Sequence, residues 1–438
     1  MVIFLKYYFV GIKGTGMSAL ALCINDIKET VIGSDNNKFY FTEERLKEKN
    51  IEILTFNKNI ISRYKDHIFI IGHSYNETNN EEVKEIFDNN YEYYYYSDFI
   101  NHYFKNIKIG ISGTHGKTTT TTLTKTLFDF NQVSYIIGDG NGKGKKNSKY
   151  LIFEACEYYQ HFLNYDYEYL IINNIDYDHP DYYNNIDEVI TAFKNVSKKA
   201  KKIIINNDDE NCEKIEHKQK YTFGIKNKSY VNGEIIEENK KGYIILVKVE
   251  NNEYIFSLPF HGKHMIYNFL ASFTVYYLCN NIDKSNIEND IKSKIRKYKS
   301  PRRRKEEIIL ENDNIIIDDY AHHPKEIEMI YEAVRQKYNN YNITIVFQPH
   351  TYSRTIYLNK EFKDVLIDKE VYIMKTFISR EEYDLLKESV VKEIFINHKE
   401  YDVNIIKEIL KKENQIILCL GAGDIHNEIK KWYNKCKL

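Results

Sequence analysis

The stretch that decides the fold is Gly110-Ile111-Ser112-Gly113-Thr114-His115-Gly116-Lys117, which is followed by five threonines at 118–122. An apolar strand, residues 107–111, runs into glycines at 110, 113 and 116, so the chain reads G-x-x-G-x-x-G-K-T. The common phosphate-binding signature has a glycine five residues before the GK pair, where this chain has Ile111. Turn amides and the N-terminus of a following helix both attract phosphate oxygens. The sequence therefore predicts a phosphate-binding loop between a strand and a helix.

Two residues of this loop have a predicted chemical task. Lys117 would meet the terminal phosphates of a nucleoside triphosphate, and the hydroxyl of Thr118 would bind Mg²⁺. The alternative is a glycine turn that only caps a threonine-rich helix. Strand, turn, lysine and threonine all fall where phosphate binding needs them, which favours a nucleotide site.

Composition sets the class of protein and excludes several functions. The chain has 438 residues, 42% of them hydrophobic and 29% charged, which is typical of a soluble globular protein with about three domains. Lys and Arg number 62 against 63 Asp and Glu, so the formal net charge is -1. No overall basic field would attract nucleic acid, and we expect no nucleic-acid partner.

Cysteine usage and hydropathy bear on the location of the protein. The six cysteines include no C-x-x-C pair, which argues against a disulfide framework and against a thiolate zinc site. No apolar run reaches the length of a membrane span, and the strand-like stretch 2–10 begins almost at the N-terminus. We therefore expect no export signal, no membrane partner and a cytoplasmic location.

The first of three α/β segments, residues 1–105, carries a second glycine turn. A strand leads into the turn 11–16, and a helix follows with Met17, Leu20, Ala21 and Ile24 at helical spacing. The next strand, 29–32, is followed by Asp35. This pattern is similar to a dinucleotide fingerprint, so a nicotinamide-dependent oxidoreductase is one reading of the turn.

The second segment, 106–297, places acidic and histidine residues after its strands. Strand 150–153 ends in Glu154, and strand 169–172 leads to His179. Ligands of open parallel sheets bind beyond the carboxyl ends of the strands, so Glu154 and His179 are candidate metal ligands. A structural ion pair and a turn residue are the alternatives. The glycine- and lysine-rich stretch 138–146 is interpreted as a mobile loop.

The third segment, 298–438, begins at a cationic linker, residues 297–305, which is interpreted as solvated surface. Strands 314–317, 343–347 and 415–420 each deliver a polar cluster at their carboxyl ends, and Pro324 opens a helix. These clusters are 318–323, 348–355 and 421–424. We expect them to meet at one edge of a sheet, where a ligand would bind.

Seven motifs occur in one order along nearly the whole chain: GIKGTGMSALA, GTHGKTTTT, EACEYYQHFL, NIDYDHPDYY, DDYAHHPKEI, QPHTYSRT and GAGD. In this combination the chain resembles the Mur ligase family. The resemblance implies an α/β fold of three domains: a Rossmann-like UDP-sugar domain at 1–105, a P-loop ATPase domain at 106–297, and a Rossmann-like amino-acid domain at 298–438. It also implies ATP and Mg²⁺ as cofactors.

The motifs of the last third favour one activity within the family. They imply transfer of L-alanine to the lactyl carboxylate of UDP-N-acetylmuramate through an acyl phosphate, in peptidoglycan precursor synthesis. The alternative is a related ligase that adds a different amino acid or a peptide. The resemblance implies a monomer or a weak homodimer.

Site residues follow from the matched motifs. The resemblance implies nucleotide contacts from the loop and from three later positions: Gly113, Thr114, His115, Gly116, Lys117, Thr118, Thr119, His264, Asn268 and Arg304, with Arg303 as the neighbouring choice. The implied metal ligands are Thr118, Glu154 and His179. The implied UDP-sugar contacts are Gly14, Thr15, Gly16, Met17, Ser18 and Asp35, and the implied amino-acid contacts are Tyr320, His322, His350 and Arg354.

The reaction assigns work to several of these groups. Lys117 would neutralise phosphate charge, and Arg354 would hold the carboxylate of alanine with two hydrogen bonds. A histidine would take the proton of the amine, but sequence does not separate His322, His350 and His179.

Three positions depart from the family pattern or are left without a role. Lys13 stands where a glycine is usual, and it either contacts the diphosphate or points to solvent. The segment 72–75 matches only in part, so no contact is assigned there. Lys194 lies where other members carry a modified lysine, and here it is interpreted as a surface helix residue.

Overall fold

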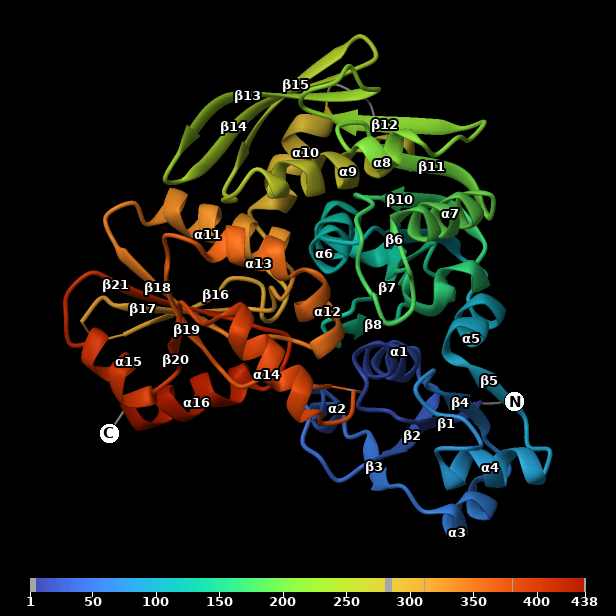
Figure 1. Cartoon of the computed structure of the whole chain (residues 1–438). Helices are drawn as coiled ribbons and strands as arrows, with labels where there is room; N and C mark the ends of the chain where they lie inside the picture. Colours follow the sequence, from blue (N-terminus) through green and yellow to red (C-terminus); the bar gives the residue numbers. More distant parts are fainter. Residues whose placement is uncertain (1–4, 280–285, 311, 380, 437–438) are drawn as a thin grey trace. The chain divides into compact units, whose positions relative to one another are not determined.

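The computed structural model describes residues 5–279, 286–310, 312–379 and 381–436 (Figure 1). By internal contacts the chain divides into two units. The first contains 1–176, 190–232 and 268–299, and the second contains 177–189, 233–267 and 300–438. The start of the predicted strand 2–10 lies outside the described residues, and its described part is β1 (Lys6–Val10).

The first unit opens with a five-stranded parallel sheet in the order β3-β2-β1-β4-β5. In the short strands β1 and β2 every residue after the first is buried, as in sheets covered on both faces. The helix predicted after the glycine turn is α1, and the strand predicted before Asp35 is β2. The elements are β1, α1 (Thr15–Asp26), β2 (Thr30–Asp35), α2 (Glu43–Glu48), β3 (Glu52–Thr55), α3 (Lys58–Ile61), η1 (Ser62–Tyr64), β4 (Ile68–Ile71), α4 (Glu81–Asp88), β5 (Tyr93–Tyr95) and α5 (Tyr96–Tyr103).

A second sheet of the first unit has the strand order β12-β11-β10-β6-β9-β7-β8. The predicted phosphate loop follows β6, which pairs in parallel with β10 on one side and with β9 on the other. The chain segments after β9 and β10 therefore flank the loop. The elements are β6 (Ile107–Ser112), α6 (Lys117–Leu127), η2 (Phe130–Gln132), β7 (Val133–Ile136), β8 (Gly142–Lys143), β9 (Tyr150–Glu154), η3 (Tyr158–Asn164), β10 (Tyr167–Ile172), α7 (Ile186–Ser197), β11 (Ala200–Asn206), α8 (Glu210–Glu213), β12 (Lys220–Gly224), α9 (His264–Cys279) and α10 (Ile287–Ile295).

The second unit contains a six-stranded sheet in the order β16-β17-β21-β18-β19-β20, parallel except for β16. It also contains an antiparallel hairpin of β14 and β15. The elements are β13 (Val231–Asn239), β14 (Gly242–Val249), β15 (Asn252–Leu258), β16 (Glu306–Ile309), β17 (Ile315–Asp319), α11 (Pro324–Lys337), β18 (Asn342–Phe347), α12 (Tyr352–Tyr357), α13 (Asn359–Leu366), β19 (Glu370–Ile373), α14 (Leu385–Ile394), β20 (Lys399–Glu400), α15 (Val403–Ile409), β21 (Gln415–Leu420) and α16 (Ile425–Cys436).

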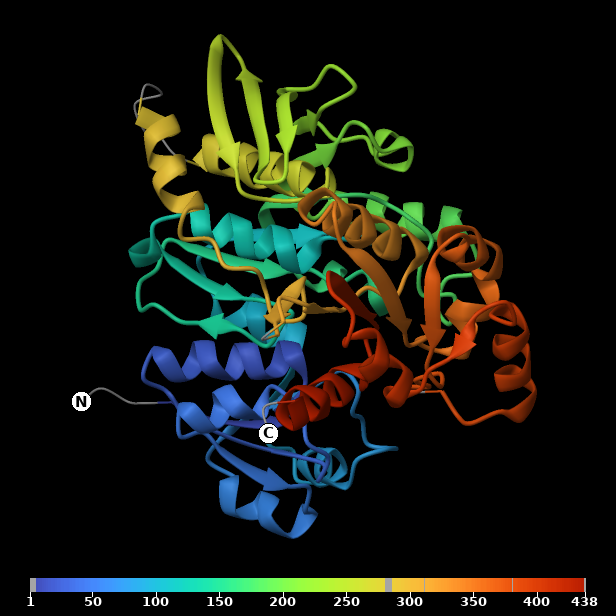
Figure 2. The same cartoon turned by 90° about the vertical axis from the view of Figure 1, so that its left-hand side faces the viewer.

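The central strands β17, β18 and β21 of this sheet are mostly apolar because both faces are covered. Successive residues of β17 alternate between two cores: Ile315 and Ile317 pack with α11, α13 and α14, whereas Ile316 packs with α15 and α16. Figures 1 and 2 allow these two helical layers to be followed. Asp318 and Asp319 follow at the end of this buried strand, and the period of two directs their side chains to opposite faces of the sheet.

The longest helix of the described residues is α9, with 16 residues. Its side chains are buried on several sides, among them Phe269, Leu270 and Phe273, because it packs inside a domain. Within the described ranges, no helix combines the length and the apolar character that crossing a bilayer requires.

The glycine-rich stretch 138–146 is an ordered part of the first unit, so its interpretation as a mobile loop is wrong. It contains β8, which lies directly against the backbone of α1. A Cβ on Gly142 would lie 1.7 Å from the carbonyl oxygen of Ala19, and one on Gly144 would lie 1.9 Å from that of Cys23. The Cys23 thiol donates to the carbonyl of Lys143 at 3.3 Å. Only glycine permits this approach of strand to helix.

We predict that Gly142→Ala lowers the free energy of unfolding by about 2 kcal/mol, because the added methyl group must push β8 away from α1. Urea unfolding monitored by circular dichroism measures the change. Lys143→Ala is the control in the same strand, and we expect it to change stability by less than about 0.5 kcal/mol. Equal stability of the Gly142 variant and the parent protein would contradict the tight contact.

Candidate functional site

The phosphate loop uses backbone conformations that favour glycine. Gly113 has φ +128° and Gly116 has φ +79°. A Cβ on Gly113 would lie 3.0 Å from the amide nitrogen of Asn173, and one on Gly116 would lie 2.8 Å from Oδ1 of Asn268. Both glycines are therefore required by the turn and by what packs against it.

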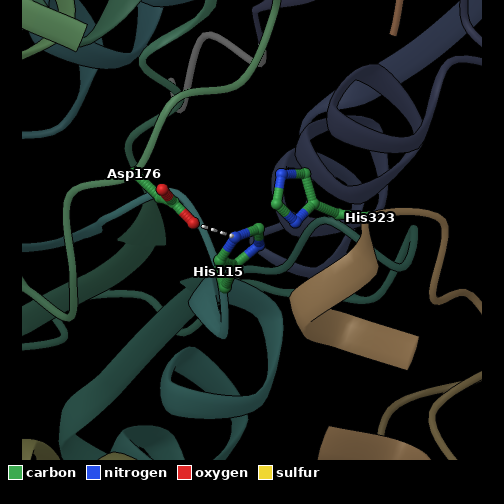
Figure 3. Close-up of side chains that lie close together, drawn as sticks. All are labelled: His115, Asp176 and His323. Carbon is green, nitrogen blue, oxygen red and sulfur yellow. Dashed lines mark ion pairs between the residues drawn. The ribbon is translucent and has the colours of Figure 1, made fainter. Parts of the chain in front are cut away.

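The residues after β10 hold the loop in place. The amide of Thr114 donates to the carbonyl of Asn174 at 3.1 Å, and the amide of His115 donates to the side-chain oxygen of Asn174 at 2.8 Å. The amide of Asp176 donates to the Thr114 hydroxyl at 2.8 Å. Figure 3 shows the carboxylate of Asp176 directed at the ring of His115, with 3.5 Å between Oδ2 and Nε2. His115, predicted only as a nucleotide contact, is thus also a structural member of the loop.

Lys117 is folded back into the loop. Its Nζ donates to the carbonyls of Gly113 and Thr114 at 2.6 and 3.0 Å and lies 3.0 Å from both carboxylate oxygens of Glu157. Burial by itself would lower the pKa of Lys117, but the buried carboxylate of Glu157 holds that pKa above its ordinary value. Lys117 is therefore a cation whose present partner is an internal carboxylate.

Two of the predicted metal ligands lie next to each other. The hydroxyl of Thr118 donates to Oε2 of Glu154 at 3.2 Å, and the amide of Gly138 donates to Oε1 at 2.5 Å. Burial raises the pKa of Glu154. A hydroxyl and a carboxylate at the N-terminus of α6 form an oxygen donor set of the kind that Mg²⁺ prefers. The third predicted ligand, His179, belongs to the second unit, where it has φ +58°.

The predicted nucleotide contacts outside the loop lie in different surroundings. Asn268 is 5% exposed and accepts a hydrogen bond from the hydroxyl of Thr120, so it lies beneath the helix that follows the loop. His264 begins α9, and burial together with the charges of Lys305 and Arg304 lowers its pKa to about 4. His264 and Arg304 are thus neighbours in the second unit.

The interpretation of the whole cationic linker as solvated surface is wrong, because Arg303 is buried. Its side chain is 6% exposed, and its guanidinium donates to the carbonyls of Gly421 and Gly423 at 2.6 and 3.4 Å. Its Nε lies 3.4 Å from Oδ2 of Asp318. Arg303 is committed to joining the ends of β17 and β21, which leaves Arg304 as the nucleotide candidate of the pair.

A cavity of about 290 Å³ opens at the first glycine turn. Five of the predicted UDP-sugar contacts line it, namely Gly14, Thr15, Gly16, Met17 and Asp35. Ser18 does not line this cavity, because its hydroxyl is buried and donates to the carbonyl of Thr15. The remaining lining residues are Gly11, Tyr40, Gly72, His73, Ser74, Tyr75 and Tyr96.

Sequence reasoning missed the aromatic side of this cavity. Tyr96 begins α5 and lies 3.2 Å from where a Cβ on Gly16 would stand. His73 stacks on His161 with 3.8 Å between ring centroids, and burial lowers its pKa to about 4. The signal that was available is position: Gly72 directly follows β4, at the same sheet edge as the glycine turn.

Lys13 follows neither alternative considered from the sequence. It is 7% exposed, so the reading in which it points to solvent is wrong. Its Nζ donates to the carbonyls of Asn36 and Lys38 at 2.8 and 2.9 Å and forms an ion pair with Glu43 at 2.9 Å. Lys13 orders the chain after β2 and does not line the cavity.

The four predicted amino-acid contacts come together in the second unit. The rings of Tyr320 and His322 are 5.5 Å apart, and those of His322 and His350 are 5.3 Å apart. Arg354, on α12, donates from NH1 to Nδ1 of His350 at 3.0 Å. The ends of β17 and β18 therefore build one cluster of three rings and a guanidinium.

Sequence models of one family match most of the chain. Residues 6–107 match "Mur ligase family, catalytic domain", residues 111–276 match "Mur ligase middle domain", and residues 303–423 match "Mur ligase, glutamate ligase domain". The chain belongs to the Mur ligase family. The α/β fold with three domains is thereby confirmed.

Solved structures of Mur ligases share the fold over the full length. UDP-N-acetylmuramate-alanine ligase from Thermotoga maritima has a TM-score of 0.79 at 21% identity, covering 99% of both chains. A murein peptide ligase from Psychrobacter arcticus has a TM-score of 0.71 at 18% identity, covering 99% of this chain and 98% of that one. A pseudomurein peptide ligase type C from Methanothermus fervidus has a TM-score of 0.64 at 18% identity, covering 98% and 99%. At these identities the likeness concerns the fold alone.

In this Mur ligase Arg354 is paired with a carboxylate of the chain itself. Nε of Arg354 lies 2.8 Å from Oδ1 of Asp178, and both side chains are less than 10% exposed. Burial by itself would raise the pKa of Asp178, but Arg354 and the adjacent His179 hold it well below its usual range. The segment 177–189 is thereby attached to α12 by a buried ion pair.

The three polar clusters predicted at strand ends meet as expected. Gln348, after β18, hydrogen bonds to the carboxylate of Asp424 and accepts from the amide of Ile425, both after β21. His426 hydrogen bonds to Asp318 at the end of β17 at 2.6 Å. One edge of the sheet therefore carries all three clusters.

We predict that Asp178 and Arg354 are strongly coupled in stability. Asp178→Ala and Arg354→Ala each lower the free energy of unfolding by about 3 kcal/mol, because each leaves a buried charge without its partner. A double-mutant cycle, measured by urea unfolding, gives a coupling energy of about 2 kcal/mol.

The control cycle uses Glu168 and Lys201, whose charged atoms are 2.8 Å apart but whose lysine side chain is 75% exposed. There we expect a coupling below about 1 kcal/mol. A buried pair that couples no more strongly than this exposed pair would contradict the structural account.

Proposed function

We propose that this Mur ligase joins L-alanine to the lactyl carboxylate of UDP-N-acetylmuramate, with hydrolysis of ATP to ADP and phosphate. The observation that carries the proposal is that the first unit contains both the phosphate loop and the cavity at the glycine turn. The third requirement, an amino-acid site, is supported by the cluster of Arg354, His322 and His350 in the second unit. We assign the UDP-sugar domain to 1–105, the ATPase domain to 106–297 and the acceptor domain to 298–438.

The first step joins two anions, so the site must offset their repulsion. An oxygen of the lactyl carboxylate attacks the γ-phosphorus of ATP, and ADP leaves. Lys117 exchanges Glu157 for phosphate oxygens and spreads the negative charge that develops on the transferred group. Thr118, Glu154 and His179 would hold Mg²⁺, which neutralises phosphate charge when bound.

The second step forms the amide. Arg354 holds the carboxylate of alanine and so orients its amine toward the acyl phosphate. The nitrogen attacks the carbonyl carbon, and phosphate leaves with the carboxylate oxygen. Removing one proton from the nitrogen completes the amide.

We place the reaction in the cytoplasm, on the ground that the described cysteines are free thiols.

Phosphate release over a panel of acceptors tests the activity. In the presence of UDP-N-acetylmuramate, ATP and Mg²⁺, we expect L-alanine to stimulate phosphate release more than any other amino acid and far more than a tripeptide. The reason is that an α-carboxylate bound to Arg354 brings the α-amine next to the histidines, whereas a peptide separates the two groups. Stimulation by a tripeptide alone would instead identify a peptide-adding ligase.

A substitution that keeps the positive charge tests the role of Arg354. Arg354→Lys should raise the KM for alanine about tenfold, because lysine lacks the planar pair of donors that grips a carboxylate. The KM values for ATP and UDP-N-acetylmuramate should stay within about twofold of the parent values. Arg335→Lys, on the exposed side of α11, is the control. An unchanged KM for alanine would remove Arg354 from the acceptor site.

A further inference from the structure

We call Tyr320, His322, His350 and Arg354 the acceptor cluster. The hydrogen bonds of this cluster distinguish its two histidines, which the sequence does not. A neutral imidazole carries one proton, on either Nδ1 or Nε2, and the partners of one nitrogen determine the state of the other. A carbonyl oxygen can only accept a hydrogen bond, and a guanidinium can only donate one. Each histidine of the cluster has one of these unambiguous partners.

His322 has acceptors on its Nδ1. This nitrogen lies 2.9 Å from the carbonyl oxygen of Tyr320 and 3.4 Å from a carboxylate oxygen of Glu326. Nδ1 must therefore carry the proton, which leaves the lone pair of the neutral ring on Nε2. Among the described residues, no hydrogen bond to this Nε2 is found, and the side chain is 15% exposed, so a small molecule can reach it.

His350 has the opposite arrangement. Its Nδ1 lies 3.0 Å from NH1 of Arg354, which can only donate, so Nδ1 accepts and Nε2 carries the proton. A second proton would bring a positive charge onto the ring directly beside the guanidinium. His350 is therefore unsuited to accept a proton.

The third histidine, His179, is assigned to the metal. A metal ligand uses the lone pair that a base would need. His322 is then the one candidate of the three whose lone pair is left for a substrate.

We propose that His322, through Nε2, accepts the proton that the amine of the incoming amino acid loses as the amide bond forms. This assignment rests on the proposed function. The amino acid reacts as the neutral amine, having already released one proton to solvent. As the nitrogen bonds to the carbonyl carbon, it becomes strongly acidic and passes a proton to Nε2. The bond between carbon and the phosphate oxygen breaks, and phosphate leaves with the electron pair.

The surroundings of His322 keep its lone pair available. Burial, and less strongly the charge of Arg354, lower its pKa to about 4, while Glu326 and Asp178 act in the opposite direction. The ring is thus neutral near pH 7. The carboxylate of Glu326 beside Nδ1 would stabilise the imidazolium that forms during the reaction.

The test separates amine deprotonation from formation of the acyl phosphate. His322→Asn places an amide donor near the position of Nδ1, so the hydrogen bond to Tyr320 can persist while the base is lost. Two reactions are measured with UDP-N-acetylmuramate, ATP and Mg²⁺: alanine ligation, and hydroxamate formation with hydroxylamine. The adduct of hydroxylamine is a much stronger acid than that of alanine and loses its proton to water without help.

We expect His322→Asn to lower kcat for alanine about a hundredfold, with the KM for alanine and the rate of hydroxamate formation within about twofold of the parent values. Retained hydroxamate formation also proves that the variant is folded. His322→Gln, which loses the Tyr320 hydrogen bond as well, should show at least the same loss. His398→Asn, a histidine of the same domain after α14, is the control and should behave as the parent protein.

Two results would overturn the assignment of His322. One is an unchanged kcat for alanine, and the other is a parallel fall of alanine ligation and hydroxamate formation. Absence of hydroxamate with the parent enzyme would be a different failure, because it would refute the acyl-phosphate chemistry itself and the assignment with it.

Discussion

The attachment of the phosphate loop to the residues after β10 is the interaction on which the rest of the site depends. Glycine turns have no intrinsic preference for one shape, so this loop is shaped by its partners. Asn174 and Asp176 bind it through backbone and side-chain groups, and Asn173 limits what can stand at Gly113. The same run of chain then continues to Asp178 and His179. The segment after one strand thus both shapes the phosphate loop and supplies Asp178, which forms the buried ion pair with Arg354.

Two cations that the proposed reaction needs for its anionic substrates are held by carboxylates of the chain itself. Lys117 is paired with Glu157, and Arg354 is paired with Asp178. A buried cation without a partner would cost several kcal/mol, so these pairs make the substrate-free protein stable. Substrate anions must compete with them. In the proposed reaction Glu157 would yield Lys117 to phosphate, whereas Arg354 would keep Asp178 on Nε and offer other donors to a carboxylate.

Much of the fold was predictable because it depends on the spacing of apolar residues and on the positions at which the strands end. The strands around Ile109, Ile171 and Ile317, the helix after Pro324 and the meeting of three polar clusters follow from apolar runs that stop at polar residues. What could not be predicted depends on contacts between distant segments. Lys13, Arg303 and Gly142 of β8 were misread because their partners, Glu43, Gly421 and Ala19, are not marked by any local pattern.

In the site, too, local patterns were predictable and contacts between distant segments were not. Motif positions predicted which residue types come together, but the proton positions of His322 and His350 depend on single hydrogen bonds to Tyr320 and Arg354. Tyr96 was missed at the cavity because tyrosine is so frequent in this chain that one more carries no signal, and His73 was missed because segment 72–75 matches the family pattern only in part.

The most direct test of the central claim follows one oxygen atom. UDP-N-acetylmuramate labelled with ¹⁸O in its lactyl carboxylate is incubated with the enzyme, ATP, Mg²⁺ and alanine, and the released phosphate is analysed by mass spectrometry. An acyl phosphate requires that one labelled oxygen leaves the carboxylate with the phosphate for each amide formed. Phosphate without label would show that the carboxylate was never phosphorylated and would contradict the account.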